Sequence, residues 1–162
     1  VYSVAFDPSG RYIVTGCWDD HLRIFEIRGN KLEEVIEKKH PDYVYGVAFD
    51  PSGKRIATGC RDKYLSIFEI RGNKLEEVIE KKHPGYVYSV AFDPSGKRIA
   101  TGCWDDHLRI FEIRGNKLRK IIKKKHPSIV YGVAFDPSGR YIATGCYDNH
   151  LRIFEIKYEG EK

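Results

Sequence analysis

Cysteine and histidine recur at a spacing that is capable of binding a transition metal. The pattern Cys-x-x-x-His occurs as Cys17/His21, Cys103/His107 and Cys146/His150. Tyr64 replaces the histidine in the remaining copy. Zinc needs about four ligands that converge on one point. Two ligands in each of several repeats do not converge, so we expect neither a metal nor another cofactor.

The four cysteines occupy the same position in each repeat, at Cys17, Cys60, Cys103 and Cys146. Equivalent positions on stacked sheets lie about 10 Å apart, whereas a disulfide needs Cα atoms within about 7 Å of each other. We therefore predict four reduced, buried thiols. Reduced thiols are typical of the cytoplasm, which is the predicted location.

A block of 43 residues recurs four times, beginning at Val1, Val44, Val87 and Val130. A fixed period of this length predicts one supersecondary unit per repeat, in an array whose members bury their apolar faces against one another. The predicted units of this single domain are residues 1–43, 44–86, 87–129 and 130–162.

Each repeat contains four runs that are typical of strands, as in Val44–Phe49, Lys54–Cys60, Tyr64–Ile70 and Lys74–Glu80. Gly72-Asn73 before the last run is a two-residue hairpin signal. Lys, Leu and Glu also favour a helix over Lys74–Glu80, but the hairpin and the short length favour a strand. Polarity rises from the first run to the fourth, which predicts an all-β propeller of four-stranded antiparallel blades with the first strand nearest the axis.

The repeat resembles the WD-repeat β-propeller unit across essentially the whole chain. The resemblance rests on a histidine before the first strand (His40, His83, His126), the stretch VAFDPSGRYIATG, and CWDDHLRIFEI. The last stretch ends in Phe-Glu where the family has Trp-Asp. The resemblance implies a non-enzymatic scaffold that binds protein or peptide partners.

The resemblance also implies a buried hydrogen-bond network in each blade. Its members are His40, Thr58 and Asp62, then His83, Thr101 and Asp105, then His126, Thr144 and Asp148. Phe stands in place of the family's Trp, which removes one bond worth about 1 kcal/mol. The same residue types form hydrolase triads, but a triad occurs once, beside an oxyanion hole. Because this set recurs in successive blades, we predict no catalytic residue and no enzyme.

The resemblance places a partner-binding face at the connections between blades and between the second and third strands. The candidate residues on it are Tyr2, Trp18, Tyr45, Arg61, Tyr88, Trp104, Tyr131 and Tyr147. Trp, Tyr and Arg are enriched at binding hot spots. The alternative, that the tyrosines only pack between blades, stays open.

The last repeat ends without the segment that forms the outer strand of the others. Four blades in a row also leave an apolar face on the first and the last, and large exposed apolar patches are rare on monomers. Either the four blades close alone, or two chains form an eight-bladed ring. The family's usual seven or eight blades favour the homodimer.

The net charge of +5 is concentrated in Lys117–Lys125, KLRKIIKKK. A solvated outer strand explains it most simply, and an anion or nucleic-acid site is the alternative. We do not expect nucleic acid as a partner, because one basic blade without interleaved aromatic residues is a weak footprint. The chain has no apolar run that would span a membrane. Near-identical repeats also fit an engineered or recently amplified propeller without an evolved partner.

Overall fold

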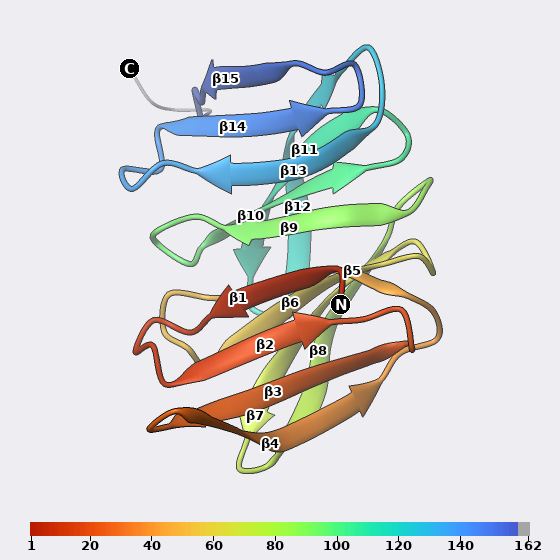
Figure 1. The fold of residues 1–162 in the computed structure, drawn as a ribbon. Helices are drawn as coiled ribbons and strands as arrows, with labels where there is room; N and C mark the ends of the chain where they lie inside the picture. Colours follow the sequence, from red (N-terminus) through yellow and green to blue (C-terminus); the bar gives the residue numbers. More distant parts are fainter. Residues whose placement is uncertain (159–162) are drawn as a thin grey trace.

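The computed structural model describes residues 1–158, and the regular structure in this range consists of fifteen β-strands (Figure 1). Blade 1 contains β1 (Ser3–Phe6), β2 (Tyr12–Gly16), β3 (His21–Arg28) and β4 (Lys31–Lys39). Blade 2 contains β5 (Val44–Phe49), β6 (Arg55–Cys60), β7 (Tyr64–Arg71) and β8 (Lys74–Lys82). Blade 3 contains β9 (Val87–Phe92), β10 (Arg98–Cys103), β11 (His107–Arg114) and β12 (Lys117–Lys125). Blade 4 contains β13 (Val130–Phe135), β14 (Tyr141–Cys146) and β15 (Leu151–Glu155).

Each blade is an antiparallel meander whose strands pair in sequence order. The predicted fold class, an all-β propeller with four blades in the chain, is confirmed. The helical alternative for Lys74–Glu80 is wrong, because this segment lies in β8 and pairs with β7. Among the described residues, blade 4 has three strands where the other blades have four. No helix in this part of the chain is long and apolar enough to cross a membrane.

The turn between the first two strands of a blade is built by its aspartate, as blade 2 shows. The N–H of Gly53 donates to the carbonyl of Asp50 at 3.0 Å, and the Asp50 carboxylate accepts from the N–H of Arg55 at 2.9 Å. Gly53 has a φ of +74°, a region that glycine enters without steric cost. This turn fixes the register of β5 on β6.

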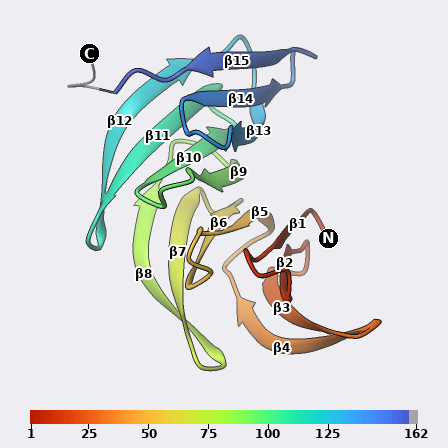
Figure 2. The same ribbon diagram turned by 90° about the vertical axis from the view of Figure 1, so that its left-hand side faces the viewer.

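The four blades follow one another around the side on which β1, β5, β9 and β13 lie (Figure 2). β1 packs beside β5, β5 beside β9, and β9 beside β13. The apolar core lies between blades: Val14 and Ile24 of blade 1, for example, pack with Ile56 and Phe68 of blade 2. Each blade therefore depends on its neighbour for burial, as the repeat period predicts.

Candidate partner-binding face and blade junctions

A row of tyrosines lies along the starts of the innermost strands. The rings of Tyr2 and Tyr45 are 5.0 Å apart between centroids, and those of Tyr45 and Tyr88 are 4.8 Å apart. Tyr131 continues the row at 4.8 Å from Tyr88. These separations are within the range of favourable aromatic contacts. The structure thus brings together in one row four of the five tyrosines that the resemblance assigned to this face.

A second row follows the ends of the second strands, where Trp18, Trp104 and Tyr147 are 63%, 51% and 64% exposed. Tyr43 and Tyr86 connect the rows in blades 2 and 3. Tyr43 lies 5.7 Å from the Trp18 ring, and Tyr86 lies 6.1 Å from the Trp104 ring. Tyr147 contacts the first row directly, at 5.9 Å from Tyr131. The result is one continuous aromatic surface across four blades.

Arg61 stands at the position that Trp18 and Trp104 occupy in blades 1 and 3. Its guanidinium lies 5.0 Å from the Tyr43 ring centroid and 5.4 Å from that of Tyr86, within the distance of a cation–π contact. A hydrogen bond with Tyr86 raises the pKa of Arg61. Partial burial raises the pKa of Tyr88 to about 12, so this phenol is neutral at physiological pH. The surface therefore combines neutral aromatic rings with one cation.

The buried histidines bond to threonines of the next blade. The distance from Nε2 to Oγ1 is 3.3 Å for His40 and Thr58 and 3.0 Å for His83 and Thr101. The pair formed by His126 and Thr144 repeats this contact at 2.9 Å. In each case Nδ1 donates to the carbonyl of the residue two positions earlier. The ring stacks edge-on against the phenylalanine that replaces the family's tryptophan.

The aspartates expected in this network bond to other partners. The carboxylates of Asp105 and Asp148 pair with Arg109 and Arg152, four residues further on. Asp62 accepts from the N–H of Tyr64 at 3.0 Å. The physical reason is that a backbone carbonyl already uses the Nδ1–H of each histidine. These arginine pairs were not predicted from the sequence, although an arginine occurs at this position in blades 1, 3 and 4.

The histidine–threonine pairs are shielded from solvent. Thr58 and Thr101 are fully buried, and His83 is 2% exposed. Burial lowers the pKa of His83 to about 4 and also lowers the pKa of His40 and His126. These histidines are therefore neutral at pH 7, and each pair joins one blade to the next as a structural bond.

The cysteine and histidine positions are not assembled into a cluster. All four cysteines are free thiols, but the prediction that all are buried is wrong for Cys17 and Cys146, which are half-buried. Burial raises the pKa of Cys60 to about 12. His21 and His107 each donate from Nδ1 to the carbonyl of an aspartate two residues earlier. Within residues 1–158, no group of three or more His, Cys, Asp or Glu side chains is placed to hold a metal ion.

Equivalent residues differ sharply in exposure at the two end blades. Val4 of blade 1 is 65% exposed, whereas its equivalent Val47 is 5% exposed. Ile153 of blade 4 is 66% exposed, whereas its equivalent Ile110 is fully buried. Phe6 and Leu151 follow the same rule, at 65% and 71%. The outward faces of the first and last blades are thus apolar and uncovered.

The glycine that follows the threonine in each second strand shows the same difference. A Cβ on Gly59 would lie 2.7 Å from the Val87 carbonyl oxygen, and one on Gly102 would lie 2.8 Å from that of Val130. A Cβ on Gly145 would meet nothing within 4 Å. Among the described residues, Gly145 of blade 4 therefore lacks the close contact that the next first strand makes with Gly59 and Gly102.

The fold and these junctions define a repeat protein whose blades are joined by recurring internal contacts. The model of the family described as WD domain, G-beta repeat matches residues 1–26, 32–69, 76–112 and 116–155. The chain therefore belongs to the WD40 family, whose propellers are typically non-enzymatic and commonly bind protein partners. A comparison with curated proteins found no match.

Proposed function

We propose that this chain is a non-enzymatic scaffold that binds a protein or peptide partner on its aromatic face. The observation that carries the proposal is the continuous surface that joins Trp18, Arg61, Trp104 and Tyr147 to the tyrosine row. Large, rigid rings bury much area at a low cost in conformational entropy, and Trp, Tyr and Arg dominate binding hot spots.

The alternative of a symmetric propeller without an evolved partner is disfavoured by the same surface. The buried histidine and threonine are identical in all three junctions that contain them. The position before the turn aspartate is instead Trp, Arg, Trp or Tyr in successive blades. Symmetry alone does not require such differences, whereas recognition of an asymmetric partner does.

A selection from a random 12-residue peptide library tests the aromatic face. We expect the selected peptides to bind the Trp18→Ala/Trp104→Ala variant at least tenfold more weakly than the unchanged chain. Tyr141→Ala serves as a control, because Tyr141 is exposed but lies at the opposite end of its strand. The proposal fails if the selected peptides bind the double variant and the unchanged chain equally well.

We further propose that two copies of this chain form a closed eight-bladed ring. The internal junctions support this proposal, because in each of them the face that is open on blade 4 packs against the face that is open on blade 1. Val47 and Ile110 are buried because a neighbouring blade covers them. Val4 and Ile153 occupy the equivalent positions in the end blades, where no blade covers them, and they are exposed. Head-to-tail contacts that close on themselves satisfy both end faces at once.

The solution mass tests the ring. The chain has a mass of 18.7 kDa, so light scattering at micromolar concentration should give twice this value. A mass of one chain would contradict the proposal. In that case the aromatic face remains testable by the peptide selection, because it lies on blades that are already packed together.

We also propose a cytoplasmic location, on the argument that equivalent blade positions do not suit disulfides. The free, half-buried thiols of Cys17 and Cys146 support it, because accessible thiols persist in a reducing compartment. Imaging of the fluorescently tagged chain in cells tests the location. A signal confined to a secretory compartment would contradict this proposal.

A further inference from the structure

Arg61 lies within the aromatic surface, between two tryptophans of the neighbouring blades. Its position in blade 2 is equivalent to that of Trp18 in blade 1 and Trp104 in blade 3. Tyr43 contacts both the Trp18 ring and the Arg61 guanidinium. Tyr86 connects the same guanidinium to the Trp104 ring. The row therefore places one cation between two indole rings, and both tryptophans are more than half exposed.

The neighbours of Arg61 hold it in place before any partner binds. Its N–H donates to the Tyr43 carbonyl at 2.9 Å, and its half-buried side chain lies against two tyrosine rings. Trp104 is packed closely as well, because a Cβ on Gly85 would lie 3.2 Å from the Cβ of this tryptophan. Side chains that are already ordered lose less conformational entropy when a partner binds.

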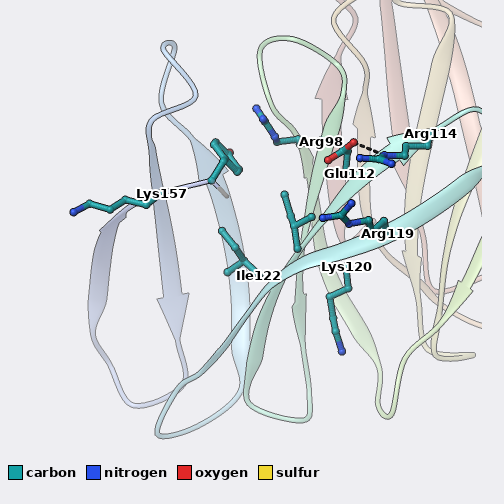
Figure 3. Close-up of a pocket in the computed structure, with 9 residues that line it drawn as sticks. Arg98, Glu112, Arg114, Arg119, Lys120, Ile122 and Lys157 are labelled. Atoms are coloured by element: carbon teal, nitrogen blue, oxygen red, sulfur yellow. Dashed lines mark hydrogen bonds and ion pairs between the residues drawn. The ribbon is translucent and has the colours of Figure 1, made fainter. Parts of the chain in front are cut away.

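Arg61 has different partners from the arginines at the outer hairpins. Arg114, for example, pairs with Glu112 at the outer end of blade 3 (Figure 3). In the range of residues that the structure describes, Arg61 has tyrosine rings as its contacts and forms no ion pair, and Asp42 acts on it from a longer distance. A guanidinium has five N–H donors, and a flat ring does not use them all. Arg61 can therefore donate to an anionic group of a partner.

The charges around the row favour a single carboxylate over a polyanion. Asp19 and Asp105 directly follow the two tryptophans, and each pairs with an arginine of its own blade. They leave Arg61 as the cation of the aromatic surface. A nucleic acid has a phosphate at every nucleotide and needs several cations for tight binding. One carboxylate, by contrast, matches one guanidinium through two parallel hydrogen bonds.

We propose that the aromatic face binds a protein segment in which an acidic residue stands between two apolar residues. The Asp or Glu side chain pairs with Arg61, and the apolar side chains cover Trp18 and Trp104. This inference rests on the proposed function, because it names the chemistry of the partner at the same surface. The apolar contacts on both sides exclude water from the ion pair, which strengthens its electrostatic attraction.

A peptide library with glutamate fixed at the centre of 12 otherwise random residues tests the proposal. Selection on the 162-residue chain should yield binders with apolar residues on both sides of the glutamate. Each binder is then synthesised again with glutamine at the centre. Calorimetry should show about tenfold weaker binding of the glutamine peptide, because hydrogen bonds to a charged group are the stronger ones. A library without binders, or equal affinity of the two peptides, would overturn the proposal.

Variants of the chain assign the preference for glutamate to one residue. Arg61→Gln should bind both peptides equally, and so should Arg61→Tyr, which introduces the residue of blade 4. Arg71→Gln is the matched control, because it removes the same charge from the same blade at the outer hairpin, where Arg71 contacts Glu76 at 3.0 Å. It should retain the tenfold preference. A preference for glutamate that persists in both Arg61 variants would contradict the proposal.

The loss of the tryptophans separates this inference from the proposed function. Trp18→Ala should weaken the glutamate and glutamine peptides by the same factor, because it removes an apolar contact and leaves Arg61 in place. If the peptides require the tryptophans but bind equally well with glutamine, the acidic partner is excluded and the scaffold function stands. If the Trp18→Ala/Trp104→Ala variant binds the peptides as the unchanged chain does, the proposed function fails as well.

Two further measurements exclude other occupants of this surface. A single-stranded oligonucleotide of 12 thymidines should bind more weakly than the glutamate peptides. Tighter binding that Arg61→Gln abolishes would identify nucleic acid as the partner and overturn the proposal. Light scattering should give the Trp18→Ala/Trp104→Ala variant the same mass as the unchanged chain. A smaller mass would show that a second copy covers the face, which would also overturn the proposal.

Discussion

At the scale of single residues, burial of neutral histidines makes the stability of this chain sensitive to acid. The His83 ring lies between two blades. Its two nitrogens form hydrogen bonds with the Thr101 hydroxyl and the Lys81 carbonyl. Protonation would place a charge where no carboxylate is bonded to the ring. The folded state therefore binds this proton less readily than the unfolded state does.

The first prediction follows from this difference in proton affinity. The pKa of His83 is about 4 in the folded chain against 6.5 for the free side chain. Stability is therefore complete above pH 6.5 and falls as the pH decreases towards 4, with a loss of about 2 kcal/mol by pH 5 from this group. Denaturant unfolding between pH 7 and pH 5 should show a shallower pH dependence for His83→Gln than for the unchanged chain. Identical slopes would contradict this origin.

A second prediction concerns blade 2, which lacks the arginine that the third strands of the other blades contain. Ser66 stands where blade 1 has Arg23. Partial burial and the neighbouring Glu80 carboxylate raise the pKa of Glu77 to about 7. A carboxyl with a raised pKa makes the fold less stable as the pH rises from 4.5 towards 7. Ser66→Arg should lower this pKa and add about 0.5 kcal/mol at pH 8, a typical value for exposed pairs.

Unfolding experiments at pH 5 and pH 8 check this second prediction. The Ser66→Arg variant should gain more stability at pH 8 than at pH 5. Ser66→Ala is the control, because it removes the hydroxyl without adding a charge. A gain that is the same at both pH values would show that the arginine acts through packing rather than through Glu77.

At the scale of the element, the turn between the second and third strands contains a residue other than glycine with a left-handed backbone. Its third residue has a positive φ in every blade, and it is Asp20, Lys63, Asp106 or Asn149. The carbonyl of this residue accepts the N–H of the junction histidine in three blades, for example from His83 to Lys63 at 2.7 Å. The left-handed conformation thus orients a backbone hydrogen bond that holds the junction histidine to its own blade.

The third prediction uses Lys63, which has a φ of +77°. Asn and Asp tolerate this conformation better than Lys does, and glycine enters it without steric cost. Lys63→Gly or Lys63→Asn should raise the free energy of unfolding by about 0.5 to 1 kcal/mol. Thermal unfolding measures the gain, and Asp106→Asn, which exchanges two tolerant residues, should change little. A destabilised Lys63→Gly variant would contradict this account of the turn.

At the scale of the whole molecule, the end faces decide how many blades surround the axis. In the second strands of blades 1 to 3, a glycine allows the first strand of the next blade to approach closely. A Cβ on the equivalent Gly145 of blade 4 would meet nothing within 4 Å. The Ser–Gly alternation at Ser3, Gly46, Ser89 and Gly132 has a period of two repeats. A junction from blade 4 to the first blade of another copy therefore repeats the junction from blade 2 to blade 3.

The fourth prediction is that Gly145→Ala weakens the proposed dimer without affecting the single chain. By analogy with Gly102, the added Cβ would meet the main chain of Val1 in the second copy. Light scattering across a dilution series should show dissociation at a concentration at least tenfold higher than for the unchanged chain. Gly102→Ala is the control, because it should lower the melting temperature instead. A dimer unchanged by Gly145→Ala would exclude this junction.

The sequence by itself determined the fold class, because one 43-residue block repeated four times buries its apolar faces against further copies of itself. The resemblance to WD repeats also assigned Tyr2, Tyr45 and Trp104 to one face. Only the tertiary structure decided the partners of polar side chains. Asp105 bonds to Arg109 rather than to His83 because hydrogen bonds depend on ångström-scale positions, which spacing along a chain does not specify. The uncovered faces of blades 1 and 4 likewise depend on how far the array extends around its axis, which no single repeat encodes.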